Sequence, residues 1–173
     1  MVKKPGRMYR EIRGQAYTRR EYMGGVPGDR IVQYEMGNAK GEFPIQINLI
    51  AKEACQIRHM SLEAARVAAN RYIQKRAGVT NYHLKIVVYP HHVLRENKVA
   101  VGAGADRISD GMRGSFGSLV GTAARVRSGQ KLIFIRTTEA NIKHAKDALR
   151  KAGIKMPSPC RIEVLRDGKP IAG

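Results

Sequence analysis

The sequence is poor in cysteine, in acidic residues and in aromatic side chains, and it contains no tryptophan. Its 173 residues include two cysteines, 14 Asp and Glu, and 6% aromatic residues. Because Cys55 and Cys160 are separated by most of the chain, two buried reduced thiols in a cytosolic protein are favoured over a structural disulfide. No apolar run approaches the ~20 residues of a membrane-spanning helix. No apolar segment follows the charged residues 1–7, so we expect neither a secretory signal nor a membrane span.

The few acidic residues are opposed by 32 Lys and Arg, which gives a formal net charge of +18 at pH 7. The segments 1–41, 42–94, 95–131 and 132–173 carry net charges of +5, +4, +4 and +5, so the excess is spread evenly. The chain is nevertheless 43% hydrophobic, which is more than a disordered chain usually contains. A folded chain with this charge is expected to bind a polyanion on several sides, and a neutral enzyme with a basic tail is excluded.

Residues 1–30 differ from the rest because they show neither helical nor alternating apolar periodicity. Glycine and proline interrupt this segment, and basic residues alternate with tyrosines. Cationic side chains neutralise phosphates, and tyrosine rings stack on unpaired bases. We interpret 1–30 as an extended RNA-binding arm, poorly ordered on its own, with a solvated disordered tail as the alternative. Its candidate RNA-binding residues are Lys3, Lys4, Arg7, Arg10, Arg13, Tyr17, Arg19, Arg20 and Tyr22.

From residue 31 onward the pattern is periodic and predicts strands. Alternating apolar residues place them at Ile31–Met36, 45–51, 84–90, Thr122–Arg127, Lys131–Thr137 and 160–164. The dipeptide Ser128-Gly129 predicts a two-residue hairpin turn between the fourth and fifth of these strands. Asp167-Gly168 predicts a turn after the last strand.

Two helices are predicted from apolar residues at helical spacing. Ser61 is the expected N-cap of the first and Gly78 its stop, while Thr138 and Gly153 bound the second. Their apolar faces comprise Leu62, Ala65, Ala69, Tyr72 and Ile73, and Ile142, Ala145, Leu149 and Ala152. These elements predict an α+β fold, a two-layer sandwich with both helices on one face of a largely antiparallel mixed sheet. Residues 31–173 are expected to form this single domain.

The segment 95–121 fits neither periodicity and is expected to protrude as a loop. Gly102–Gly121 contains six glycines, and the segment exceeds the ~12–15 residues beyond which loops are usually functional or disordered. A nucleotide-binding loop is disfavoured, because Arg107 stands where a dinucleotide fingerprint needs glycine and no Gly-Lys-Ser/Thr triplet occurs. We favour a slender backbone with Arg107 and Arg113 as phosphate contacts over a flexible hairpin tip.

No catalytic or metal-binding constellation is recognisable in the sequence. Adjacent His91 and His92 would point to opposite sides of a strand, and the other three histidines lack ligands at metal spacing. The carboxylates mostly neighbour basic residues, and no Gly-x-Ser-x-Gly occurs. We therefore expect no catalytic residue, no metal and no cofactor. Both helices lack the pattern of a basic DNA-recognition helix, which favours structured RNA over DNA.

Several segments resemble one known family. Tyr17-Thr18-Arg19-Arg20-Glu21-Tyr22 and Gly25-Val26-Pro27-Gly28 are similar to the N-terminus of ribosomal protein L10e of archaea and eukaryotes, the counterpart of bacterial L16. Gly104-Ala105-Asp106-Arg107, Gly111-Met112-Arg113-Gly114 and Gly121–Val126 are similar to the same family. Further matching segments at 62–66 and 90–95 extend the resemblance over essentially the whole chain.

The resemblance implies a structural protein of the large ribosomal subunit, in the cytoplasm, that binds large-subunit rRNA near the aminoacyl-tRNA corridor. It implies that the arm threads into rRNA and that the loop extends toward the peptidyl transferase centre and bound tRNA. The loop residues it places near tRNA are Gly104, Arg107, Gly111, Met112, Arg113 and Gly114.

The implied partners are rRNA, tRNA and neighbouring ribosomal proteins, without a free homo-oligomer. We expect an archaeal source, because the chain stops at Gly173 without the longer tail of eukaryotic members. An RNA-modifying enzyme or assembly factor that only visits the ribosome, and a DNA-compacting protein, are the alternatives.

Overall fold

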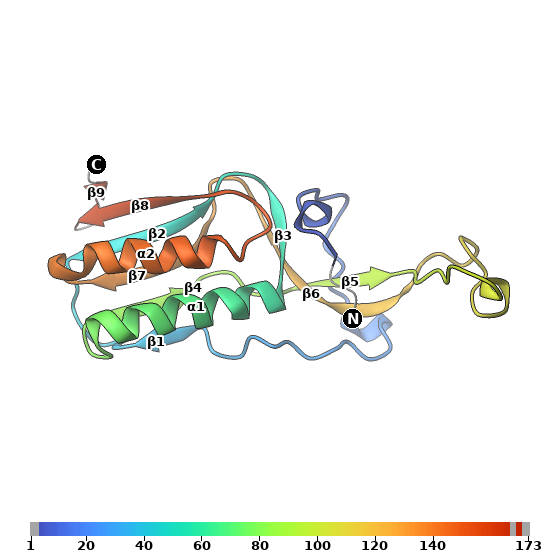
Figure 1. The fold of residues 1–173 in the computed structure, drawn as a ribbon, viewed down its shortest axis with the longest axis horizontal. Coiled ribbons are helices and arrows are strands. Elements are labelled where there is room, and N and C mark those ends of the chain that lie inside the picture. Colours follow the sequence, from blue (N-terminus) through green and yellow to red (C-terminus); the bar gives the residue numbers. More distant parts are fainter. Residues whose placement is uncertain (1–3, 167–168, 171–173) are drawn as a thin grey trace.

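The computed structural model describes residues 4–166 and 169–170, and these form a layered body with a long projection at one end (Figure 1). A six-stranded sheet is the base of the body. Its strands, in spatial order, are β1 (Glu35–Gly37), β4 (Tyr82–Ile86), β7 (Lys131–Thr137), β2 (Ile45–Ala51), β8 (Cys160–Arg166) and β9 (Lys169–Pro170).

A second sheet of three strands forms the base of the projection. It comprises β3 (Cys55–Arg58), β6 (Ser118–Val126) and β5 (His92–Glu96), with β6 in the middle. Helices α1 (His59–Ala77) and α2 (Ile142–Gly153) lie side by side over one face of the larger sheet (Figure 1). The α+β prediction is therefore confirmed. All strand pairings of the described residues are antiparallel, and the strands divide between two sheets.

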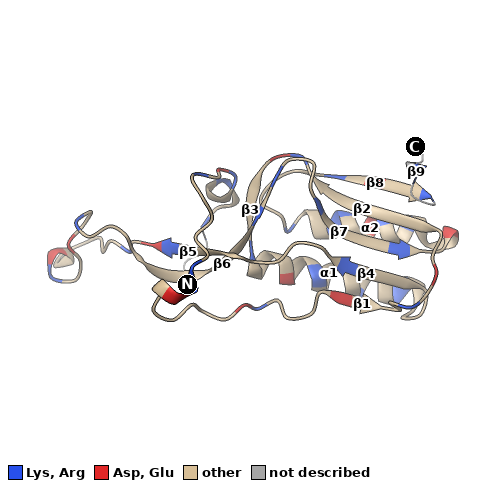
Figure 2. Ribbon diagram, turned by 180° about the vertical axis from the view of Figure 1, so that it is seen from behind, with Lys and Arg blue, Asp and Glu red and all other residues tan. Residues whose placement is uncertain are grey.

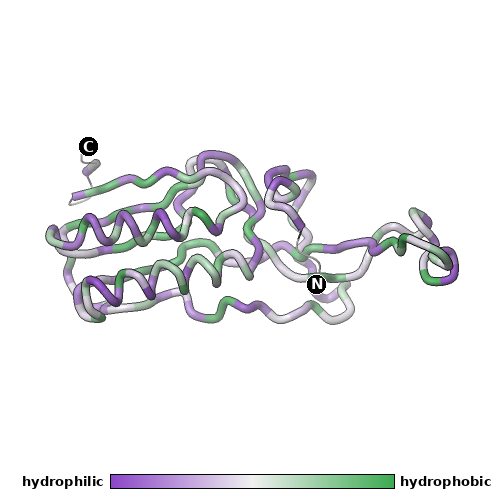
Figure 3. The backbone as a smooth tube through the Cα atoms, in the orientation of Figure 1, coloured by the Kyte–Doolittle hydropathy of each residue, from purple (hydrophilic) through white to green (hydrophobic). Residues whose placement is uncertain are grey.

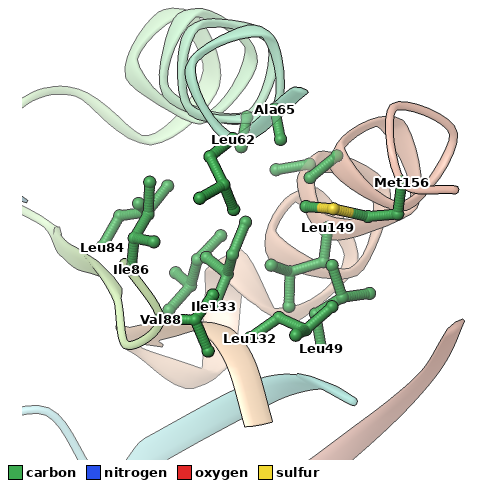
Figure 4. Packing of buried hydrophobic residues seen from close by; sticks show 14 of the residues in the cluster. Leu49, Leu62, Ala65, Leu84, Ile86, Val88, Leu132, Ile133, Leu149 and Met156 are labelled. Carbon is green, nitrogen blue, oxygen red and sulfur yellow. The ribbon is translucent and has the colours of Figure 1, made fainter. Parts of the chain in front are cut away.

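The core fills the space between the helices and the larger sheet. Leu62 and Ala65 of α1 and Leu149 of α2 point toward Leu49 and Ile133 of the sheet, and all five are at most 1% exposed (Figure 4). Hydrophobic and hydrophilic residues are interspersed along both helices (Figure 3). In α2 the buried residues form one apolar face, whereas α1 also carries exposed apolar residues such as Val67. Full burial of such side chains stabilises the fold by about 1.5–3 kcal/mol each.

Several predicted element boundaries are wrong. The second helix does not begin at Thr138, which makes no side-chain cap; Glu139–Asn141 is a short 3-10 turn, and α2 starts at Ile142. The strand predicted at 84–90 ends at Ile86. The first helix does not begin at a Ser61 cap, because β3 runs directly into α1 and the helix starts at His59 without a side-chain cap. The strand predicted at Ile31–Met36 is replaced by the shorter β1, although Ile31 is buried as its pattern suggests. β1 pairs with Lys85, Leu84 and His83 of β4. Because β4 ends at Ile86, only one residue beyond Lys85, the residues before β1 have almost no neighbouring strand to pair with.

The predicted hairpin between 122–127 and 131–137 is also wrong. β6 pairs with β3 and β5, whereas β7 pairs with β2 and β4. The Ser128-Gly129 turn exists, but it bonds to β2: Gly129 N–H donates to Ala51 O at 2.8 Å, and Ala51 N–H donates to Gln130 O at 3.1 Å. The chain thus passes from one sheet to the other at this turn. The turn predicted at Asp167-Gly168 lies outside the described residues.

The projection consists of β5, the first half of β6 and the loop that joins them. The two strands pair out to Glu96 and Ser118, so the ends of the predicted 95–121 segment are strand and the loop proper is 97–117. Gly117 closes the loop with φ +78°, and a Cβ there would lie 2.5 Å from the carbonyl carbon of Glu96. This position therefore requires glycine. Figure 1 shows the loop reaching away from the helices.

Candidate nucleic-acid interface

The arm lies against the smaller sheet and the start of α1. Tyr17 N–H donates to His92 Nδ1 at 2.8 Å, and Val93 N–H donates to Tyr17 O at 2.9 Å. Arg30 N–H donates to His59 Nδ1 at 2.9 Å, and Met23 is buried. The sequence predicts an extended segment that is poorly ordered on its own, because its local pattern does not reveal these partners distant in sequence.

The basic side chains of the arm divide into two groups. Lys4 pairs with Glu96 at 2.8 Å, Arg10 Nε donates to Pro157 O at 2.8 Å, and Arg13 pairs with Glu11 at 2.8 Å. These contacts fasten the arm to the body or to itself. A second group is exposed and, among the described residues, enters no ion pair: Arg7, Arg19, Arg20 and Arg30. Tyr22 beside them is 74% exposed, and Lys3 lies outside the described residues.

Arg95 joins the arm to the base of the loop. Its guanidinium donates to Gly117 O at 2.8 Å and to Tyr17 Oη at 3.1 Å. The same group lies 3.9 Å from the centre of the Phe116 ring, which meets the Tyr17 ring edge-on at 6.1 Å. Arg95 of β5 therefore contacts the arm and the end of the loop at once. This role was not predicted from the sequence, where its one signal is an arginine shortly before a glycine-rich loop.

His92 and Arg125 hold the arm from the sheet. Arg125 donates through Nη1 to Gly14 O at 2.7 Å and through Nη2 to Arg13 O at 3.3 Å. Burial of the imidazole, reinforced by the nearby charges of Arg125 and His91, lowers the pKa of His92 to about 4. A neutral ring can keep Nδ1 unprotonated, which is what accepting the Tyr17 N–H requires.

The tip of the loop presents both charged and apolar side chains to solvent. Arg107, Met112 and Arg113 are exposed, Met112 to 79%, and the flanking Gly104 and Gly114 are exposed as well. Gly111 is half-buried because its carbonyl accepts from Asn97 Nδ2 at 3.1 Å. The tip of the loop thus has internal hydrogen bonds without packing on the body. The predicted arm residues lie near the base of the projection and the predicted loop residues at its far end, as two separate sites (Figure 1).

Comparison with known proteins shows the family to which the chain belongs. A family profile described as "Ribosomal protein L16p/L10e" matches residues 12–163. The chain belongs to this family. Among its relatives, each named "Large ribosomal subunit protein uL16", that of Methanosphaerula palustris is 59% identical over 166 residues, 96% of both chains. That of Thermoplasma acidophilum is 57% identical over 173 residues, 100% of this chain and 98% of the relative.

Membership of the L16p/L10e family confirms the recognition made from sequence motifs. The chain is a structural component of the large ribosomal subunit and not an enzyme, and it associates there with rRNA and other ribosomal proteins in the cytoplasm. The archaeal relatives agree with the expected archaeal assignment. In the part of the chain that the structure describes, no helix is long and apolar enough to cross a membrane. No cluster of three potential metal ligands occurs in that part either.

A basic surface on the helix layer escaped the sequence analysis. Lys143, Lys146 and Arg150 of α2 are exposed at helical spacing, and Arg71 and Lys75 of α1 are exposed on the same layer. Figure 2 shows Lys and Arg on the arm, the loop, the strands and both helices. The i, i+3, i+7 spacing of the α2 cations was the available signal. Lys and Arg side chains are therefore available on several sides of the molecule.

The two cysteines are free thiols, as the sequence analysis favoured. Cys55 is buried and Cys160 half-buried, and Ser158 Oγ–H donates to Cys55 Sγ at 3.3 Å. Burial raises the pKa of the Cys160 thiol to about 11, and it raises that of Cys55 as well. Both sulfurs therefore stay protonated at neutral pH and have a structural role in the core.

Proposed function

We propose that the chain binds large-subunit rRNA with its arm and basic body, and that loop 97–117 reaches bound tRNA near the peptidyl transferase centre. The observation that carries the proposal is the projection itself. Paired strands β5 and β6 hold Arg107, Met112 and Arg113 away from the core, while the arm is docked at the base of the same strands. This geometry separates the surface of the arm, proposed to anchor the protein on rRNA, from the tip of the loop, proposed to contact tRNA.

The anchoring surface is expected to act through phosphates. Arg7, Arg19 and Arg20 are exposed and have no carboxylate partner among the described residues, so RNA phosphates can approach them without breaking an existing ion pair. Each neutralised phosphate releases counterions, which makes the affinity depend on salt. Planar guanidinium groups also bind phosphate with two parallel hydrogen bonds.

The first experiment replaces Arg19 and Arg20 together with alanine. If both contact phosphate, the slope of log affinity against log salt concentration for an rRNA fragment should fall in magnitude by about 1.4–1.8. Thermal unfolding should be unchanged, because both side chains are exposed. The measurement is a filter-binding titration at several KCl concentrations. An unchanged slope in a folded variant would show that these arginines do not touch phosphate.

The second experiment deletes Gly104–Gly114 from the loop tip. The hydrogen bonds of this segment run to other residues of the loop, so the fold and docking on the large subunit should be retained. Sucrose-gradient sedimentation with large subunits tests docking, and tRNA binding to reconstituted subunits tests the tip. The expected result is normal co-sedimentation with impaired tRNA binding. Loss of folding, or normal tRNA binding, would contradict the division of roles.

Partners other than a second copy of the chain are expected. A formal net charge of +18 causes copies of the protein to repel one another in the absence of RNA. The isolated protein should therefore sediment as a monomer at moderate salt. A stable dimer under these conditions would refute this part of the proposal.

A further inference from the structure

A hollow of about 670 Å³ lies between the arm, the smaller sheet and the base of the loop. We propose that it holds one unstacked nucleotide of single-stranded RNA, an inference that rests on the proposed RNA-facing role of the arm and loop. Its volume falls in the range of about 300–1,000 Å³ typical of small-ligand sites. Residues from all three parts line it, including Tyr17 of the arm, His92 and Arg125 of the sheet, and Phe116 of the loop.

An aromatic surface is available to a base in this hollow. Phe116 is 69% exposed, although its side chain is large and apolar. The Arg95 guanidinium lies near the ring at 3.9 Å, and the Tyr17 ring meets it edge-on. These neighbours fix the ring without covering most of it. Nucleic-acid bases stack on such rings, and an adjacent arginine adds a cation–π contribution.

The charge of the hollow favours an anionic ligand. Its lining includes three arginines, Arg13, Arg95 and Arg125, and one carboxylate, Glu11. Glu11 is already paired with Arg13 at 2.8 Å, so Arg95 and Arg125 remain without a carboxylate partner there. His92 faces Arg125 and is uncharged at neutral pH, so it adds no further positive charge. The single negative charge of one nucleotide phosphate would be attracted to Arg95 and Arg125 and is smaller than their combined positive charge.

Two buried polar atoms of the residues that line the hollow lack hydrogen-bond partners among the described residues: Gln56 Oε1 and Arg125 Nε. Buried polar atoms without partners are rare in folded proteins. The other nitrogens of Arg125 are bound to arm carbonyls, so its position is fixed. Arg125 Nε is a donor and Gln56 Oε1 an acceptor, and the edge of a nucleobase likewise carries donors and acceptors together.

The test measures binding of the full chain to a short single-stranded RNA and to an RNA duplex of the same length. Phe116→Leu removes the ring but keeps an apolar side chain and the backbone carbonyl that Arg95 binds. Phe116→Tyr restores a ring. Tyr89→Leu is the matched control, because Tyr89 is 64% exposed but does not line the hollow. Thermal unfolding of each variant verifies the fold.

The expected result is a loss of single-strand affinity by about 5- to 100-fold in Phe116→Leu, with duplex affinity changed by less than about twofold. Phe116→Tyr and Tyr89→Leu should bind like the parent chain. Ultraviolet crosslinking of the parent chain to the single strand should label peptides that contain Tyr17 or Phe116. Equal single-strand affinity of Phe116→Leu and the parent, or crosslinks confined to other peptides, would overturn the inference.

Failure of the inference can be told apart from failure of the proposed function. If the hollow is not the site but the arm binds RNA, Phe116→Leu is neutral while the Arg19/Arg20 variant still lowers the salt slope. If both variants are neutral, the proposed phosphate contacts of the arm fail too. Binding of an acidic peptide in the hollow, with single-stranded RNA unable to compete, would also overturn the assignment to a nucleotide.

Discussion

Protonation of His92 should release the arm from the sheet. The Nδ1 atom of His92 accepts the Tyr17 N–H at 2.8 Å, and a proton on that nitrogen would abolish the bond. Burial and the charge of Arg125 lower the pKa of His92 to about 4 from the ordinary value of 6.5. The arm contact is therefore complete at pH 7 and is expected to weaken in acid.

The magnitude and sign follow from the two pKa values. Below pH 6.5 the unfolded chain binds a proton at His92 that the folded chain refuses until the pH approaches 4. Unfolding is consequently favoured as the pH falls through this window. A full difference of this size corresponds to no more than about 3 kcal/mol of unfolding free energy, lost between about pH 6.5 and pH 4.

The assay compares the parent chain with His92→Asn, whose Oδ1 accepts the Tyr17 N–H but does not titrate. Urea unfolding at a series of pH values should show the parent losing up to about 3 kcal/mol more than the variant between pH 7 and pH 4. Because both proteins contain the same carboxylates, the contribution of these groups to the pH dependence cancels in the difference. Parallel pH profiles, or a His92 resonance titrating near pH 6.5, would refute the reasoning.

Two further predictions concern packing and the base of the loop. Leu149→Ala should cost about 2–5 kcal/mol of unfolding free energy by urea titration, because Leu149 is 0% exposed; Ile154→Ala, 68% exposed, should change it by less than about 0.5 kcal/mol. Gly117→Ala should destabilise more than Gly114→Ala in the same titration. Both glycines have positive φ, but a Cβ at Gly117 meets the backbone of Glu96 at 2.5 Å, whereas one at Gly114 meets no atom within 4 Å. Equal costs for the two glycine variants would show that the loop base relaxes around the clash.

Local patterns predicted the elements whose residues pack against neighbours at regular spacing. The apolar face of α2 is confirmed, because the burial of its side chains follows the helical period. β2 and β8 form where they were predicted, but their burial does not alternate: Asn48 and Ile50 of β2 are buried as well, and Ile162 to Leu165 of β8 are all half-buried. Boundaries that depend on a partner were harder to predict. The Ser61 cap failed because α1 continues directly from β3, and the hairpin failed because its turn bonds to Ala51 of β2.

The sequence allowed the types of residue in the candidate site to be predicted, but not which of them lie together in space. Arg19, Arg20, Arg107 and Arg113 were chosen because basic residues in glycine-broken segments without apolar periodicity stay at the surface, and the structure leaves all four exposed. Tyr17 was chosen as a free stacking ring, but it is half-buried against Arg95. A sequence of this kind does not reveal that a tyrosine and an arginine 78 positions apart meet.

The sequence by itself determined the net charge of +18, its even spread, the two amphipathic helices and the family, since composition, periodicity and motif spacing are properties of the chain. The tertiary structure decided how the charges are presented. Pairing of β5 with β6 extends the loop, and the bonds of Tyr17, Arg95 and Arg125 dock the arm beside it. These contacts join residues far apart in sequence, so their geometry exists only once the sheets have formed.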